Sequence, residues 1–575
     1  MKHSSYDAVL KKRTLVLFFF FAGALTLLGG RLFVLQILNH QEYVALAAKQ
    51  HRLVSEISYE RGGIYAQDKV GGEVPLAITK LQKDVIASPR QIKDPEGTAT
   101  LLASQLGIGR ETILAKLSKK DDAYEIIAKK VDAKVTKPLE DQKIAGITFN
   151  GERRRFYPQG NLSAHVLGFV SMEKGNEETG KYGLEQFYNK VLSGTQGLFD
   201  GFRDAAGFWI ALGKQATQPA KNGSSLVLTI DYNIQRKAEE ILSQVKEEWS
   251  SPEGIIMVMD PKTGKILALA ANPTFEPANF FSEKDLSVFL DPAVQSVYEL
   301  GSVMKPITMA AGIEEKLVHP NTTYTDTGAV TRSGYTIKNY DEKAHGVQTM
   351  TNVLEQSLNT GAVFVSDLLG PARQRKYFDL FGFGQKSGVD LSGEVSGSLA
   401  NLNHGRPINF ATAAFGQGIS ATPLQMANAI GALANDGKLM RPYIVEKIVS
   451  DSGKETVTEP EVVQQAVSRQ TAETLTKMLV SVVRNGYTHR AGVNGYFVAG
   501  KTGTAQIPRT DGKGYSSDYI HTMVGYAPAF DPKFLVYIQL NQPRGNAFAS
   551  NTLAIAFHDL TEYILQYYQI PPEEK

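Results

Sequence analysis

Residues 255–270 read Ile-Ile-Met-Val-Met-Asp-Pro-Lys-Thr-Gly-Lys-Ile-Leu-Ala-Leu-Ala. The apolar runs at the two ends, residues 255–259 and 266–270, have the length of buried strands. The Asp-Pro-Lys-Thr-Gly segment between them combines residues that favour a tight turn. The stretch therefore predicts a β-hairpin that is buried inside a larger sheet.

Apolar runs of the same kind recur near the C-terminal end of the chain. Residues 497–499, 522–527 and 534–540 each read as a strand, whereas the long segment before them is rich in helix and loop signals. Five strands divided between the two ends of one domain, with helices between them, predict an α+β or α/β fold in which helices sandwich the sheet.

The texture of the sequence changes at Ser225, where this domain begins. Residues 226–230 form a predicted strand, and a predicted helix follows at 233–247. Residues 39–225 are polar and loop-rich, with short predicted strands at 84–87 and 145–149. Because this region contains no catalytic constellation, we interpret it as a spacer or interaction domain.

An apolar segment near the N-terminus predicts a membrane anchor. Residues 14–38 carry one charge, Arg31, which can snorkel to the interface, and spanning a bilayer needs about 20 apolar residues. The alternative is a cleaved signal peptide, since Ala22-Gly23-Ala24 resembles a cleavage site, but the apolar run continues past it. Basic residues before the segment place the N-terminus in the cytoplasm: Lys2, Lys11, Lys12 and Arg13.

Composition excludes several classes of function. The formal net charge of +2 and the absence of a basic stripe argue against nucleic-acid binding. The chain has no cysteine, which removes thiol catalysis and cysteine-containing zinc sites. Its ten histidines form no HxxxH or HExxH pair, so we expect neither a metal nor another cofactor.

Ser302-Val303-Met304-Lys305 is the first candidate for chemistry. On a helix the two polar positions share a face, so the lysine amine can approach the serine hydroxyl. Gly301 before the segment and Pro306 after it are typical of a helix start. The S-x-x-K pattern also occurs at residues 171–174 and 243–246, where we interpret it as a solvated helix face.

Two further motifs distinguish Ser302 from these copies. Ser357-Leu358-Asn359 is the one S-x-N in the chain, and Lys501-Thr502-Gly503-Thr504 follows it. A second Lys-Thr-Gly, at residues 262–264, lies in the predicted hairpin turn. Lys501 follows an apolar run as a strand residue would, and a glycine on an edge strand lets a peptide backbone approach closely.

S-x-x-K, S-x-N and K-T-G in this order resemble the signature of penicillin-binding proteins and serine β-lactamases. The surrounding sequence resembles the class B penicillin-binding proteins, which are monofunctional peptidoglycan D,D-transpeptidases. The resemblance implies an antiparallel five-stranded sheet flanked by helices in the catalytic domain, and an elongated mixed pedestal of the dimerisation type. The segments that carry it are residues 61–64, 155–158, 182–185, 299–306, 415–418, 422–425 and 498–506.

The implied organisation is a cytoplasmic tail at residues 1–13, a transmembrane anchor at 14–38, a pedestal at 39–225 and a transpeptidase domain at 226–575. The anchor places the chain in the cytoplasmic membrane as a single-pass protein, with the catalytic domain outside the cytoplasm.

The resemblance also implies the roles of the motif residues. Ser302 attacks the penultimate D-Ala carbonyl of a stem peptide, Lys305 takes its proton, and Ser357 and Asn359 relay the proton and hold the substrate amide. Lys501, Thr502, Gly503 and Thr504 bind the substrate, and the backbone N–H groups of Ser302 and Thr504 form the oxyanion hole. The implied partners are peptidoglycan stem peptides, β-lactams, a SEDS-family glycosyltransferase and divisome membrane proteins.

Within the class, the compact region from Lys501 to Ala529 resembles the division type more than the elongation type. A β-lactamase, a β-lactam sensor and a non-enzymatic scaffold are the alternatives outside it. Three departures from the class remain. Residues 64–69 lack the usual Asp-Arg pair and Gly486-Tyr487-Thr488 stands where Gly-Thr-Gly is common, and we interpret both as matters of packing or partners; Leu358 replaces a small residue in S-x-N and would narrow the site without removing the chemistry. In the pedestal, we interpret Arg153-Arg154-Arg155 as a solvated or intra-domain charge cluster and Glu185 as a packing residue.

Overall fold

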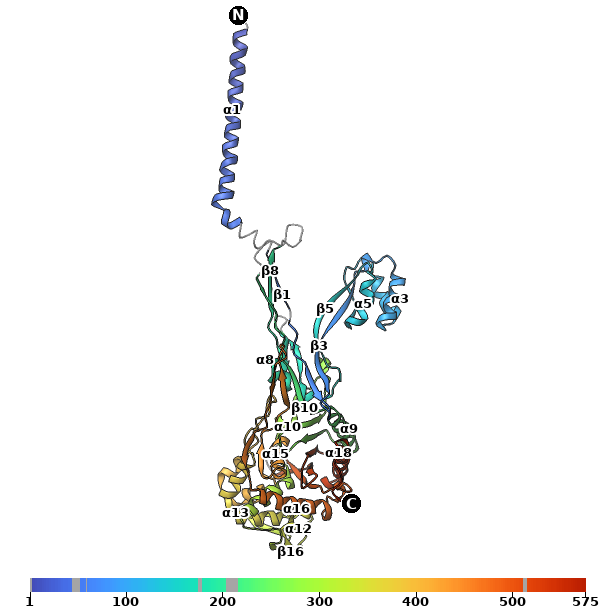
Figure 1. Cartoon of the computed structure of the whole chain (residues 1–575), viewed down its shortest axis with the longest axis vertical. Coiled ribbons are helices and arrows are strands. Elements are labelled where there is room, and N and C mark those ends of the chain that lie inside the picture. The colour runs from blue at the N-terminus through green and yellow to red at the C-terminus, as the bar shows by residue number, and fades with distance from the viewer. Residues whose placement is uncertain are drawn as a thin grey trace. The chain divides into compact units, whose positions relative to one another are not determined.

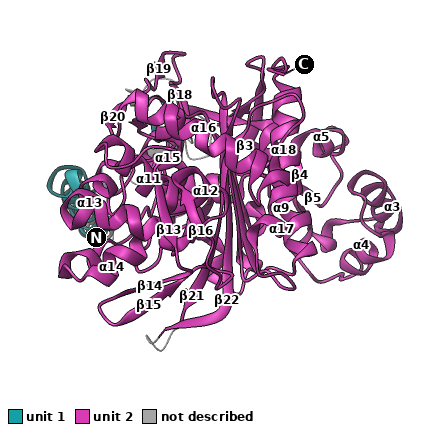
Figure 2. Ribbon diagram, turned by 90° about the horizontal axis from the view of Figure 1, so that it is seen from below, with its two compact units in different colours: residues 1–59, 195–221 teal, residues 60–194, 222–575 magenta. Residues whose placement is uncertain are grey.

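The structure, a computed structural model, describes residues 3–43, 52–57, 59–173, 178–202, 216–509 and 514–574. The chain divides into two compact units. The first combines residues 1–59 with 195–221, and the second combines residues 60–194 with 222–575 (Figure 2).

The first unit contains the predicted anchor. Helix α1 spans His3–Phe33 and continues as the π-helical turn η1, Val34–Leu38. Leu10–Leu38 is the one helical stretch among the described residues that is long and apolar enough to cross a membrane, and it is not buried by other parts of the chain. This unit also holds a three-stranded antiparallel sheet in the order β1-β8-β9, formed by Arg52–Ile57, Gly197–Phe202 and Ala216–Gln218.

Within the second unit, a seven-stranded sheet joins strands of the predicted pedestal to strands of the C-terminal domain (Figure 1). Its order is β19-β18-β10-β2-β3-β4, with β5 paired to β3, and β10 runs parallel to β2. Strand β10 is the predicted strand at residues 226–230, and it joins this sheet rather than the catalytic one. The strands are β2 Ile64–Gln67, β3 Glu73–Ala87, β4 Glu125–Asp132, β5 Ile147–Phe156, β10 Ser225–Asp231, β18 Val445–Val449 and β19 Glu455–Val457.

The C-terminal half of β3 belongs to a small layer with its own hydrophobic core. Strands β3, β4 and β5 pair there, and three helices pack around buried residues such as Leu102, Ile113 and Leu139. The short strands predicted at 84–87 and 145–149 are therefore the ends of much longer strands. The helices are α3 Pro95–Leu106, α4 Arg110–Leu117 and α5 Ala133–Asp141.

Three charged side chains are buried in the pedestal. Glu185 accepts hydrogen bonds from Arg61 Nε at 2.8 Å and Arg155 Nε at 2.6 Å, and all three side chains are at most 3% exposed. Arg61 also donates to Ser193 Oγ. The predicted intra-domain interpretation therefore holds for Arg155, whereas Arg153 forms an exposed pair with Glu60.

The predicted antiparallel five-stranded sheet of the catalytic domain is confirmed. Its order is β12-β11-β23-β22-β21. Successive residues face opposite sides, so that Val524 joins one hydrophobic core and Met523 the other. The strands are β11 Glu253–Met259, β12 Ile266–Asn272, β21 Ala499–Pro508, β22 Tyr515–Ala527 and β23 Phe534–Asn541.

Helices cover both faces of this sheet. In Figure 2, α11 (Lys305–Glu314), α12 (Met350–Glu355) and α16 (Arg469–Asn485) lie on one side of β21 and β22. Helices α9 (Tyr232–Glu248) and α18 (Ala554–Tyr567) lie on the other. The first face also carries α15, Pro423–Ala434, whose residues are all buried.

The remaining elements connect these layers. Helix α13 spans Asn359–Leu380 and is kinked at Gly370. The two-stranded sheets are β6 Phe169–Met172 with β7 Glu178–Lys181, β13 Thr323–Asp326 with β16 Gly346–Thr349, β14 Ala329–Arg332 with β15 Tyr335–Lys338, and β17 Lys438–Met440 with β20 Val462–Gln465. The short helices are α6 Ala164–Leu167, α7 Gly183–Phe187, α8 Asn189–Leu192, α10 Pro292–Gln295, α14 Pro407–Ala413 and α17 Ala549–Thr552.

Candidate active site

Ser302 lies in a tight turn at the start of a buried helix. The turn is the 3₁₀ segment η5, Gly301–Met304, and α11 begins at Lys305 with Pro306 in its first turn. The sequence predicts an α-helical start at Ser302, but the tighter turn occurs instead. Gly301 has φ of +64°, a left-handed conformation that suits glycine, and this lets the chain enter the turn. Ser302 remains half-buried.

Lys305 points to the S-x-N motif. Its side chain is buried, with 1% of the residue exposed. Its Nζ donates to the carbonyl oxygen of Ser357 at 2.5 Å and to Ser357 Oγ at 3.1 Å. The first and second motifs, which are 55 residues apart in the sequence, therefore meet through this amine.

Ser357 Oγ lies between two lysines. Lys501 Nζ donates to it at 3.1 Å, the same distance as Lys305 Nζ. A hydroxyl has two acceptor lone pairs and one donor hydrogen, so both lone pairs are engaged and the hydrogen is left to donate elsewhere. Ser357 adopts φ of +55°, an unusual backbone conformation for a residue other than glycine.

Lys501 comes from the edge strand β21. It is 2% exposed, and its Nζ also donates to the carbonyl oxygen of Thr502 at 2.9 Å. Burial lowers its pKa to about 7. Burial, with the positive charge of Lys501 second, holds the pKa of Lys305 well below the ordinary lysine value.

Gly503 lets β21 pack directly against the nucleophile turn. A Cβ atom at this position would lie 2.6 Å from the carbonyl oxygen of Leu300 and 3.0 Å from Val303 Cγ1. A larger residue would therefore push the strand away from Ser302.

The two threonines of this strand contact other segments. Thr502 Oγ1 lies 3.5 Å from Thr488 Oγ1, and Thr504 Oγ1 accepts a hydrogen bond from the backbone N–H of Ala549 at 3.2 Å. Sequence reasoning did not assign Thr488 or Ala549 to the site. Residues 486–488 depart from the class pattern, a departure that the sequence alone assigns to packing or partners rather than to the site.

Asn359 begins α13 beside the S-x-N serine. Its Nδ2 donates to the carbonyl oxygen of Lys338 at 2.9 Å, which ties it to strand β15. Leu358 is fully buried in the domain, so its side chain points into the packing and not into the site.

The duplicate motifs lie elsewhere. Ser243 is exposed on α9, and Lys246 of that copy donates to Asn272 Oδ1. Ser171 lies on β6, whereas Lys174 falls outside the described residues. The second Lys-Thr-Gly occupies the β11–β12 turn, where Lys262 pairs with Asp531. The three-motif cluster is therefore specific to Ser302.

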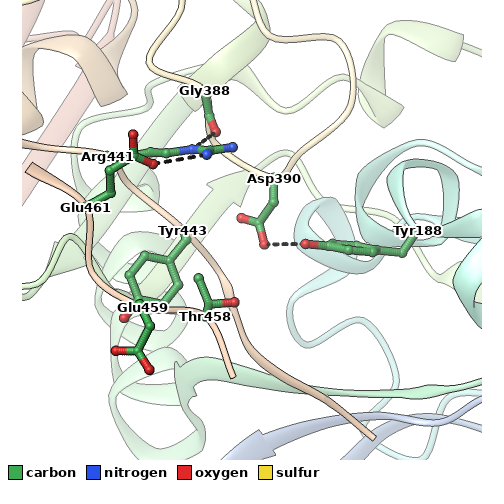
Figure 3. A pocket seen from close by; sticks show the side chains of 8 residues that line it. All are labelled: Tyr188, Gly388, Asp390, Arg441, Tyr443, Thr458, Glu459 and Glu461. Atoms are coloured by element: carbon green, nitrogen blue, oxygen red, sulfur yellow. Dashed lines mark hydrogen bonds and ion pairs between the residues drawn. The ribbon is translucent and has the colours of Figure 1, made fainter. Parts of the chain in front are cut away.

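A separate cavity of about 110 Å³ contains none of the motif residues. Figure 3 shows the Tyr188 hydroxyl pointing to Asp390, to which it donates at 3.1 Å. The lining residues are Tyr188, Gly388, Asp390, Arg441, Tyr443, Thr458, Glu459 and Glu461.

The arrangement around Ser302 is suited to nucleophilic acyl transfer. A buried amine with a lowered pKa is a competent proton acceptor, and a hydroxyl with a free donor hydrogen can return a proton to a leaving group. The second lysine supplies positive charge next to an edge strand that can pair with a peptide.

Two family models match the chain. The model described as the penicillin-binding protein transpeptidase domain matches residues 254–562, and the penicillin-binding protein dimerisation domain matches residues 56–228. The first contains all three motifs described above, and the second contains the buried Arg61–Glu185–Arg155 cluster.

Relatives extend over almost the whole chain. Stage V sporulation protein D of Bacillus subtilis is 34% identical, over 95% of this chain and 84% of its own length. Peptidoglycan D,D-transpeptidase FtsI of Buchnera aphidicola is 26% identical, over 89% of this chain and 88% of its own. The structure of penicillin binding protein 3 from Mycobacterium tuberculosis complexed with aztreonam has a TM-score of 0.69 at 28% identity, covering 90% of this chain and 98% of that one.

Proposed function

The chain belongs to the class B penicillin-binding proteins, and we propose that it is a peptidoglycan D,D-transpeptidase that acts through an acyl-enzyme on Ser302. One observation carries the assignment of residues. The Nζ atoms of Lys305 and Lys501, from two motifs, converge on Ser357 Oγ of the third, at 3.1 Å each.

In the first half of the reaction, Ser302 Oγ forms an ester with the penultimate D-Ala carbonyl carbon, and the bond to the terminal D-Ala nitrogen breaks. Lys305 accepts the serine proton, because burial and the charge of Lys501 lower its pKa and so favour the neutral amine that a base requires. Ser357 passes a proton to the departing amine, and Asn359 holds the substrate amide.

Strand β21 and the turn that carries Ser302 bind the donor peptide and stabilise the negative charge that develops on its carbonyl oxygen. Lys501, Thr502 and Thr504 bind the terminal carboxylate, and Gly503 allows the strand to lie close to Ser302. The backbone N–H groups of Ser302 and Thr504 donate to the developing oxyanion.

In the second half, an amine from a neighbouring stem peptide attacks the ester carbon. A new amide bond forms, the ester bond to Ser302 Oγ breaks, and the serine regains its proton. If water takes the place of the amine, the product is the shortened stem peptide, which is carboxypeptidase activity.

The reaction is tested with the purified full-length protein and a pentapeptide stem ending in D-Ala-D-Ala. We expect D-Ala release together with a cross-linked product when an acceptor amine is present. Release without cross-link at every acceptor concentration would identify a carboxypeptidase. The absence of release in the presence of an intact fold would reject the proposed activity.

The pH dependence of acylation follows from the two lysines. Lys305 must be neutral to act as base, so the second-order rate constant rises as pH increases through its lowered pKa. Lys501 must be charged to bind a carboxylate, so the rate constant falls as pH increases through about 7. We expect a bell-shaped profile whose basic limb moves to higher pH in Lys501→Arg, because guanidinium stays protonated. An unchanged basic limb would show that another group causes it.

The anchor and pedestal define where the enzyme works. We place the N-terminus in the cytoplasm, because basic residues precede the apolar helix, and the catalytic domain outside it. The proposed division role implies a SEDS-family glycosyltransferase and divisome membrane proteins as partners, engaged through the anchor and pedestal. The proposed domain boundaries remain residues 13/14, 38/39 and 225/226.

The similarity to a stage V sporulation protein supports a second candidate function, in which the enzyme cross-links peptidoglycan during sporulation. A fluorescent fusion separates the two. Septal signal in growing cells supports the division role, and signal confined to sporulating cells supports the other.

A further inference from the structure

Three aromatic side chains meet beside the motif cluster. The rings of Tyr340 and Tyr487 are 6.0 Å apart at 86°, and those of Tyr340 and Phe548 are 5.7 Å apart at 78°. Both contacts are edge-to-face, a favourable geometry for aromatic pairs. The three residues are 41%, 53% and 44% exposed, so the cluster, which we term the aromatic bridge, lies at the surface.

Each member of the bridge is next in sequence to a segment that touches a motif. Tyr487 precedes Thr488, whose hydroxyl lies against Thr502, and Phe548 precedes Ala549, whose N–H binds Thr504. Tyr340 follows strand β15, where Lys338 accepts the hydrogen bond of Asn359. Tyr340 therefore lies next to a segment that contacts the S-x-N motif, whereas Tyr487 and Phe548 lie next to segments that contact β21.

The segment that carries Tyr340 is anchored at both ends to one buried carboxylate. Asp326 is 1% exposed and accepts hydrogen bonds from Asn339 Nδ2 at 2.8 Å and the backbone N–H of His345 at 3.1 Å. Thr360, which follows Asn359, donates to it at 2.8 Å. These contacts hold the base of the segment, while Tyr340 itself is held across the site by its ring contacts.

We propose that the aromatic bridge is a gate beside the Ser302 motif cluster, and that Tyr340 must part from Tyr487 and Phe548 before an acylating ligand reaches the hydroxyls of Thr502 and Thr504. The inference rests on the proposed function, because it assigns those hydroxyls to the ligand carboxylate. Tyr487 occupies one of the departures from the class pattern, so the gate is specified by residues outside the three motifs.

The gate has a kinetic consequence. If only the open fraction binds ligand, the apparent acylation rate constant is the intrinsic one multiplied by that fraction. Two half-exposed ring contacts are weak enough to break during ligand entry but strong enough to keep the closed form in excess. Removing the Tyr340 ring is therefore expected to raise the acylation rate constant about tenfold.

The test measures the second-order rate constant for acylation of the full-length protein by a fluorescent penicillin. Tyr340→Ala and Phe548→Ala are expected to be faster, about tenfold for the first. Tyr340→Phe keeps the ring, and Tyr335→Ala removes another exposed tyrosine, from strand β15, so both are expected within about twofold of the unmodified chain. Competition with 6-aminopenicillanic acid, which lacks the acyl side chain, is expected to show the same acceleration.

The possible outcomes distinguish failure of the gate from failure of the proposed function. Normal acylation in the unmodified chain with an unchanged rate in Tyr340→Ala and Phe548→Ala would overturn the gate and leave the proposed function intact. Slower acylation in these variants, confined to penicillins with a side chain, would also overturn it, because the rings would then be a contact surface. If the folded, unmodified chain forms no adduct, the proposed function fails and the gate fails with it.

Discussion

Replacement of Lys305 by alanine is expected to slow acylation of Ser302 by about 10²–10⁴-fold, the range typical for removal of a general base. The lysine is buried and its pKa is held well below the ordinary value, so of the two lysines in the motif cluster it is the one more readily neutral. The measurement is the rate of fluorescent penicillin binding under single-turnover conditions.

The duplicate S-x-x-K provides a matched control. Lys246→Ala removes the lysine of the copy on α9, which contacts Asn272 and not the motif cluster, and should leave acylation unchanged. Circular dichroism establishes that both variants fold. If Lys305→Ala kept its rate within tenfold, another group would have to accept the serine proton.

The largest expected effect on stability comes from Glu185→Ala in the pedestal. The carboxylate is fully buried and pairs with both Arg61 and Arg155, so its removal leaves two buried guanidinium groups without their direct ion-pair partner. Loss of one partner from a buried ion pair destabilises a protein by about 3–5 kcal/mol. Chemical denaturation of both proteins, monitored by circular dichroism, measures the difference in the free energy of unfolding.

Glu152→Ala is the corresponding surface control. Glu152 pairs with Arg154 on β5, but its side chain is 52% exposed, and an exposed pair contributes at most about 1 kcal/mol. Equal effects for the two variants would contradict a structural role for the buried cluster. Because Glu185 is remote in sequence from the three motifs, acylation per folded molecule should be preserved in Glu185→Ala.

The sequence predicts the catalytic sheet well because its strands are buried on both faces. Such strands read as continuous apolar runs, as residues 255–259 and 534–540 do. The three motifs were identifiable for a different reason, since their order and spacing single out one copy of each. The buried position of the two lysines then follows from the helix and strand on which they lie.

Other features depend on tertiary packing and leave little trace in the sequence. Strand β10 reads like a catalytic-sheet strand, yet it pairs with β2 and β18 because those strands complete the sheet that links the two halves of the unit. Strand β3 extends over Glu73–Ala87, but polar residues interrupt its pattern where the small layer is exposed. Local periodicity cannot report either pairing.

The fine structure of the site was also beyond the sequence. The left-handed conformation of Ser357, which lets one residue present both its carbonyl oxygen and its hydroxyl to Lys305, is unusual for serine. The contact between Thr488 and Thr502 joins residues from separate elements. Both depend on how α13, α16 and β21 pack together.

The central claim is that Ser302 is the acylated nucleophile. The most direct measurement is to label the purified full-length protein with a fluorescent penicillin and locate the adduct by peptide mass spectrometry, with Ser302→Ala as the control. The structure predicts a stable ester on Ser302 and no labelling of the folded variant. An adduct on any other residue, or equal labelling of Ser302→Ala, would contradict the claim.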